Sequence, residues 1–272
     1  MTNQAMSTQA EHISEIPHHD ASSIFPIVTC VGVASALFGT AANWNKFVWG
    51  QALIVLGLAV MAVGMIGWWW ELVQENKNDE ITLLGTQSHI QRMMRLGFGF
   101  FIASEVMFFA AIFAYYFYTR SMFPTWPPPG YDRLPIAPAI INTILLVSSG
   151  FIYMWGEHKL VNGGSRGAVT LIMGFAVFLG LIFLGIQAYE WYELMHHGFT
   201  ITDGTFGTAF YMLTGFHGFH VIVGALFLGV VTARVALGHF TNNKHFAMTA
   251  AGWYWHFVDV VWILLVLVLY VF

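Results

Sequence analysis

The sequence has little charge, a single cysteine and no cluster of basic residues. Only 9% of its 272 residues are charged, whereas soluble domains average about one quarter. Cys30 has no second cysteine to pair with, which excludes an internal disulfide and any paired-cysteine redox or haem-attachment motif. The ten basic residues are scattered and the net charge is −4, so nothing indicates nucleic-acid binding. The 57% of hydrophobic residues instead predicts an integral membrane protein.

The first residues lack both features of a cleaved signal peptide. They have neither a basic start nor an early apolar segment, so we expect a polar tail that is not removed. His18 and His19 lie in this tail among several carboxylates. Such a group could buffer or relay protons near pH 7, and the alternative is a solvated tail with no such role.

Seven apolar runs follow, each about the length needed to cross the ~30 Å hydrocarbon core of a bilayer. They are Ile24–Trp44, Trp49–Trp70, Leu96–Tyr118, Ile136–Trp155, Ala168–Tyr189, Phe206–Ala233 and Met248–Phe272. The predicted fold class is therefore an all-α integral membrane protein with seven transmembrane helices. Its predicted parts are the tail (1–23), the first two transmembrane helices (24–70), a polar connector (71–95) and a five-helix transmembrane bundle (96–272). The connector could also extend a helix beyond the membrane.

The basic residues predict the orientation in the membrane. Seven spans place the tail and the second, fourth and sixth loops on one side, with seven of the ten basic residues, and leave three on the other. Cytoplasmic loops carry the excess of Lys and Arg. We therefore expect a cytoplasmic N-terminus and a C-terminus outside.

Glu105 lies about ten residues into the third span. An acid near the bilayer centre costs about 2.5–3.5 kcal/mol even on the insertion scale, so we expect it to be protonated or paired. One hypothesis is a proton-handling or carbodiimide-reactive carboxyl. The other is a neutral acid that forms a hydrogen bond to another helix.

The sixth span carries two histidines, His217 and His220, which stand ~60° apart on one helix face. Imidazole is the commonest metal ligand, but two histidines on one side of a single helix cannot bind opposite faces of a haem. We therefore predict no metal here, and expect both rings to form hydrogen bonds to neighbouring helices or to the backbone.

His256 and Asp259 share a face of the last span because they are three residues apart. They could form an internal pair, or reach Glu190 or His220 on another helix. Acid–base catalysis by such a pair would need a nucleophile and a pocket beside it, and neither is apparent. The structural interpretation is therefore favoured.

Several motifs carry a family resemblance. They are SEVMFF (Ser104–Phe109), WPPPG (Trp126–Gly130), INT (Ile141–Thr143), QAYEWYE (Gln187–Glu193), ITDGTFGTAFY (Ile201–Tyr211), TGFHGFHVIVG (Thr214–Gly224) and AAGWYWHFVDVVW (Ala250–Trp262). In these motifs, the chain resembles subunit III of the haem–copper cytochrome c oxidases in its seven-helix form.

The resemblance implies a non-catalytic subunit of a proton-pumping terminal oxidase. Haems and copper ions would then lie in partner subunits I and II, with subunit I as the main contact and the electron donor docking on other subunits. The seven helices would form a V of two and five, with phospholipids in the cleft. The subunit would stabilise the catalytic core and support proton uptake, and Glu105 matches the carbodiimide-reactive acid of the family.

The resemblance also assigns lipid contacts to Trp69, Glu75, Arg234 and His239. It matches the first helix and the tail poorly, so a proton-antenna role for His18 and His19 is a hypothesis. The chain departs from the common pattern near these lipid contacts: Gln74 and Leu237 replace frequent basic residues, and Lys244 replaces a histidine. Headgroup binding is therefore expected to be less cationic. The expected location is the bacterial inner membrane or an equivalent energy-transducing membrane.

Three other functions are open to a seven-helix membrane protein. An independent transporter or proton channel would use Glu105, His217 and Asp259 along its path. A retinal photoreceptor is disfavoured because the last span has no lysine for a Schiff base. Subunit III of a quinol oxidase would look similar, although the seven spans and the WYWHFVDVVW motif favour the cytochrome c type.

Overall fold

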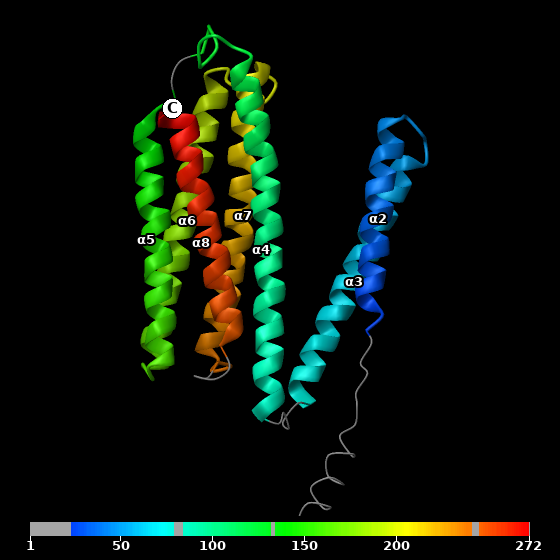
Figure 1. The fold of residues 1–272 in the computed structure, drawn as a ribbon, viewed down its shortest axis with the longest axis vertical. Helices are drawn as coiled ribbons and strands as arrows, with labels where there is room; N and C mark the ends of the chain where they lie inside the picture. Colours follow the sequence, from blue (N-terminus) through cyan, green and yellow to red (C-terminus); the bar gives the residue numbers. More distant parts are fainter. Residues whose placement is uncertain (1–22, 79–83, 132–133, 241–244, 272) are drawn as a thin grey trace, which may run out of the picture. The chain divides into compact units, whose positions relative to one another are not determined.

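The computed structural model describes residues 23–78, 84–131, 134–240 and 245–271, and the regular elements within them are all helical (Figure 1). These elements are α2 (Phe25–Trp44), α3 (Gly50–Asn78), α4 (Leu84–Ser121), α5 (Ile136–Val161), α6 (Arg166–His196), α7 (Gly204–Ala236), α8 (Phe246–Val266) and a final π-helical turn, η1 (Leu267–Val271). Among these described residues, seven helices are long and apolar enough to cross a membrane. This confirms the all-α fold with seven transmembrane helices.

Several helices are longer than the apolar runs that predicted them. Helix α3 continues to Asn78 and α4 begins at Leu84, so most of the predicted connector (71–95) is helical. Hydropathy detects only the part of a helix that prefers lipid. Polar residues at either end can therefore continue the helix into water or the headgroup region without a hydropathy signal.

The chain divides into two compact units, residues 1–84 and 85–272. In the first unit, α2 and α3 run antiparallel and meet through glycines. A Cβ on Gly57 would lie 2.8 Å from the carbonyl oxygen of Gly32 and 2.9 Å from the Cα of Ala36. Only glycine permits an approach this close, which brings backbone against backbone as in other membrane helix pairs.

In the second unit, α8 packs among α5, α6 and α7, and large side chains connect it to α4 (Figure 1). The fully buried Trp255 and Trp262 of α8 are seven residues apart, so they lie on one face. The indole N–H groups of both donate to hydroxyls of α5, Trp255 to Ser149 at 3.1 Å and Trp262 to Thr143 at 3.1 Å. The two indole rings therefore form two successive layers of aromatic packing along the bundle.

The connection between α4 and α5 is fixed to the bundle by its own side chains. The Trp126 indole N–H donates to the Tyr116 hydroxyl at 2.8 Å, and that hydroxyl donates to the carbonyl of Val268 at 2.9 Å. The Tyr131 hydroxyl donates to the carbonyl of Asp203, just before α7, at 2.8 Å. The proline-rich part of the loop, up to Tyr131, is therefore tied to the end of the bundle.

Candidate functional site

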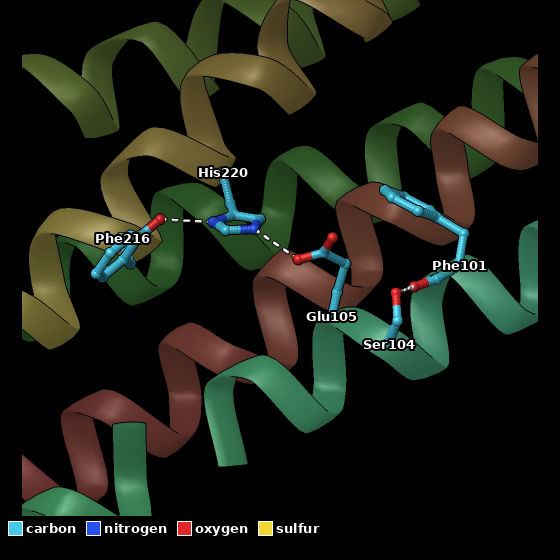
Figure 2. Close-up of polar contacts among 5 residues, drawn as sticks. All are labelled: Phe101, Ser104, Glu105, Phe216 and His220. Carbon is cyan, nitrogen blue, oxygen red and sulfur yellow. Dashed lines mark hydrogen bonds and ion pairs between the residues drawn. The ribbon is translucent and has the colours of Figure 1, made fainter. Parts of the chain in front are cut away.

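Glu105 of α4 meets His220 of α7 inside the second unit (Figure 2). The Oε2 atom of Glu105 lies 3.0 Å from the Nε2 atom of His220. The Glu105 side chain is 22% exposed and the His220 side chain 8%. Glu105 is therefore a paired acid, which is one of the two states expected for it.

The second ring nitrogen of His220 decides how many protons this contact holds. The Nδ1 atom lies 2.6 Å from the carbonyl oxygen of Phe216, one helical turn earlier. A carbonyl can only accept a hydrogen bond, so Nδ1 carries a proton. Nε2 then shares one proton with the carboxyl of Glu105. The contact is either a neutral acid donating to a neutral imidazole or an imidazolium donating to a carboxylate, and both forms have zero net charge.

Aromatic rings surround this pair. The ring of Phe109 lies 4.9 Å from the His220 ring, and the rings of Phe108 and Tyr254 lie at 6.0 and 6.4 Å. Ser104, beside Glu105 in the sequence, turns its hydroxyl to the carbonyl of Phe101 instead (Figure 2). An apolar shell of this kind favours the electrically neutral pair over any state with an unbalanced charge.

His217 has a different environment from His220, although the two share a helix face. Its ring is fully buried, stacks on Trp262 at 5.1 Å and meets the edge of Phe183 at 5.9 Å. Neither ring nitrogen has a hydrogen-bond partner among the described residues. The expected hydrogen bond is thus found for His220 and is wrong for His217. Within the described ranges, no group of three or more His, Cys, Asp or Glu residues could hold a metal ion.

His256 and Asp259 form a pair within α8, with His256 Nδ1 3.2 Å from Asp259 Oδ2. The alternative contacts to Glu190 or His220 are not formed. Gly150 of α5 faces the pair: a Cβ at this position would overlap Asp259 Oδ2 and lie 3.1 Å from the His256 ring. Gly150 was not predicted from the sequence, because a lone glycine in an apolar run does not indicate which side chain it accommodates.

The residues assigned to lipid binding are only partly described. Arg234, in the last turn of α7, is half-buried and holds its guanidinium over the Phe240 ring at 4.8 Å. His239 is exposed. The side chains of Trp69 and Glu75, and all of His18 and His19, lie outside the described residues.

Comparison with known proteins gives a consistent result. A family model described as cytochrome c oxidase subunit III matches residues 17–272. The chain is 38% identical over 256 residues to cytochrome c oxidase subunit 3 of Marchantia polymorpha, covering 91% of this chain and 93% of that protein. It is 41% identical over 249 residues to the protein of the same name from Oryctolagus cuniculus, covering 88% and 91%.

Proposed function

Because the chain belongs to the cytochrome c oxidase subunit III family, we propose that it is a non-catalytic subunit of a proton-pumping terminal oxidase. The histidines that could serve as metal ligands support this role. His220 already uses both ring nitrogens, on Phe216 and Glu105, and His217 lies on the same helix face. Neither arrangement suits a haem or a copper ion. We therefore assign the haems and copper to partner subunits I and II, with subunit I as the main contact.

The Glu105–His220 pair is the observation that carries the proposal. It holds one proton between two titratable groups at membrane depth, and the proton can reside on either group without changing the net charge. A site of this kind can take part in proton uptake toward the catalytic subunit, and its carboxyl is the group that we expect to react with carbodiimide.

The remaining roles rest on family membership and on position. We place the chain in the bacterial inner membrane or an equivalent energy-transducing membrane, with the N-terminus cytoplasmic and the C-terminus outside. Trp69, Glu75, Arg234 and His239 would bind phospholipids. The guanidinium of Arg234 lies at a helix end, where a lipid phosphate is within reach of a snorkelling side chain. His18 and His19 would collect protons on the cytoplasmic side.

A Glu105→Gln substitution in the assembled oxidase tests the proton role. Glutamine keeps the shape of the side chain and can still form a hydrogen bond to His220 Nε2, but it cannot release a proton. We expect normal haem spectra and normal assembly, together with a several-fold slower proton uptake by vesicles that contain the oxidase. Glu193→Gln is the matched control, because this exposed carboxyl at the end of α6 should leave proton uptake unchanged.

Two results would contradict the proposal. Unchanged proton uptake in Glu105→Gln would remove the proton role and leave a structural pair. The accessory role is tested by purifying the tagged chain from native membranes in mild detergent. Haem absorbance with two larger co-purifying subunits would support it, whereas a colourless chain that purifies alone would exclude it and favour the transporter hypothesis.

A further inference from the structure

The interface between α5 and α6 contains buried amide groups without partners. Asn142 of α5 is completely buried, and neither its Oδ1 nor its Nδ2 has a hydrogen-bond partner among the described residues. Gln187 of α6 is also buried, and its Oε1 has none. Each such atom costs about 1–3 kcal/mol if it remains unpaired in an apolar interior. Three of them at one interface call for a shared explanation.

The register of the two helices places these amides within about one helical turn of each other along the bundle. The Ser149 hydroxyl of α5 donates to the carbonyl of Ala176 in α6 at 2.8 Å. Because the two helices are antiparallel, the step of seven residues back along α5 from Ser149 to Asn142 matches the step of seven residues forward along α6 from Ala176 to Phe183. Asn142 therefore lies opposite Phe183. Gln187 is one turn beyond Phe183.

Trp262 confirms this register independently. Its indole N–H donates to Thr143, the residue after Asn142, at 3.1 Å. Its ring also packs edge-on against Phe183, with the centroids 4.8 Å apart. One side chain of α8 therefore touches both helices at the level of Asn142, one turn from Gln187.

Gln187 is already part of a hydrogen-bond network. Its Nε2 donates to Oε2 of the buried Glu190 at 3.0 Å, and the Tyr270 hydroxyl donates to Oε1 of Glu190 at 3.0 Å. Gln187 Oε1 remains as an acceptor and Asn142 Nδ2 as a donor, yet the two do not bond directly. A molecule that accepts from one and donates to the other would complete the network.

A groove reaches this network from outside. It has a volume of about 420 Å³ and is lined by residues of α5 and α6, with Ile141 beside Asn142, Ile186 beside Gln187, and Glu190 itself. A path therefore leads from the surface to the buried carboxyl. Its walls are mostly apolar, and Glu190 is the lining residue that also belongs to the hydrogen-bond network.

We propose that the α5–α6 interface contains a water-binding site bounded by Asn142, Gln187 and Glu190 and filled through this groove. One water accepts from Asn142 Nδ2 and donates to Gln187 Oε1, and a second donates to Asn142 Oδ1. Buried waters typically make about three hydrogen bonds to polar groups of this kind. The site extends the Tyr270–Glu190–Gln187 network into the centre of the bundle, and it is separate from the Glu105–His220 pair.

A density map of the assembled oxidase, at a resolution that shows buried waters elsewhere, tests the proposal. We expect density within hydrogen-bond distance of Asn142 and Gln187 in the wild-type protein, and loss of that density in Asn142→Leu, which keeps the same branching and number of side-chain heavy atoms but has no polar atom. Asn162→Leu, at an exposed helix end, is the matched control and should retain the density.

Wild-type density that is empty at this position, or a direct Asn142–Gln187 hydrogen bond, would overturn the proposal. Density that persists in Asn142→Leu would also overturn it, because the site would then not depend on this amide. If Asn142→Leu does not assemble, the wild-type map still decides the question, and Asn142→Ser, which retains one polar atom, provides the second variant. In this variant we expect only part of the density to remain.

Discussion

The α2–α3 pair and the α5–α8 bundle pack their helices with opposite kinds of side chain. Among the described residues of the pair, the buried positions are all small: Gly32, Gly39, Ala42, Gly50, Gly57 and Gly64. The bundle instead buries indole and phenyl rings, and connects them with internal hydrogen bonds. Lipid tails are as apolar as leucine, so neither unit gains from hydrophobic burial between its helices. The pair gains dispersion energy from backbone contact, and the bundle gains it from rings.

Glycine has a different role in each unit. In the pair, Gly57 faces the backbone of α2. In the bundle, Gly180 of α6 and Gly224 of α7 face the Trp255 ring: a Cβ at either position would lie within 2.8 Å of it. The spacing of seven residues recurs in both units, which is the repeat of helices that cross at a shallow angle. The same repeat thus supports a backbone contact in one unit and an aromatic layer in the other.

The largest predicted effect is for Trp255→Ala, which removes one ring layer of the bundle. In soluble proteins, truncation of a fully buried aromatic side chain costs about 3–5 kcal/mol. In lipid, the lost dispersion contacts and the cavity remain as costs, and Ser149 also loses the indole N–H that donates to it. We expect the chain to dissociate from the oxidase at a clearly lower temperature when the complex is heated in mild detergent. Gel analysis of subunit retention would measure this shift.

Trp253→Ala is the matched control. Trp253 lies two residues away on the same helix and is 41% exposed, so its removal should cost far less. Equal effects of the two substitutions would show that the indole layers do not hold the bundle together, and the comparison with the glycine pair would fail.

A smaller effect is expected for Gly57→Ala, which tests the backbone contact of the pair. The added methyl group would push α2 from α3, because the atoms it meets belong to the backbone and cannot rotate away. Overpacking of this kind costs about 1–3 kcal/mol. Cysteine cross-linking between α2 and α3 should slow, and the heat stability of the assembled oxidase should fall.

Gly185→Ala in α6 is the control, because a Cβ there would meet nothing within 4 Å. It should be neutral or slightly stabilising, since alanine is the better helix former. A neutral Gly57→Ala would mean that the pair does not depend on close backbone approach.

Features that depend on one helix were predictable from the sequence, and features that depend on helix rotation were not. The seven spans follow from apolar length, and the His256–Asp259 pair follows from a spacing of three residues. The partner of Glu105 lies 115 residues away in the sequence. His217 and His220 share a face, so periodicity cannot tell which of them meets the acid. That choice depends on how α7 is rotated against α4, which is set by rings such as Phe109.

The unpartnered amides were missed for a related reason. Asn142 and Gln187 are single polar residues within recognised motifs, and nothing local indicates how far apart they lie on the two neighbouring helices. Only the antiparallel register of α5 and α6, fixed by Ser149 and Ala176, shows that they lie within about one helical turn of each other.

The smallest predicted effect concerns the hydrogen bonds that hold the loop at the end of each unit. Main-chain bonds close the α2–α3 turn, from Phe47 N to Ala42 O and from Gly50 N to Phe47 O. In the bundle, the Tyr131 hydroxyl ties the loop to Asp203. Tyr131→Phe removes that single bond, and we expect a cost of about 1 kcal/mol, seen as a small drop in the heat stability of the assembled oxidase.

The pH dependence of this effect separates the hydroxyl from the ring. Burial, and then the nearby Asp203, raise the pKa of the Tyr131 phenol above its ordinary value of 10.0. Its stabilisation is therefore fully present below pH 10 and is lost as the pH rises through the folded-state pKa. The wild-type protein should approach the stability of Tyr131→Phe above pH 10, while the two differ at pH 8. A constant difference across this range would mean that the ring contacts with Phe199 and Phe206, and not the hydrogen bond, hold the loop in place.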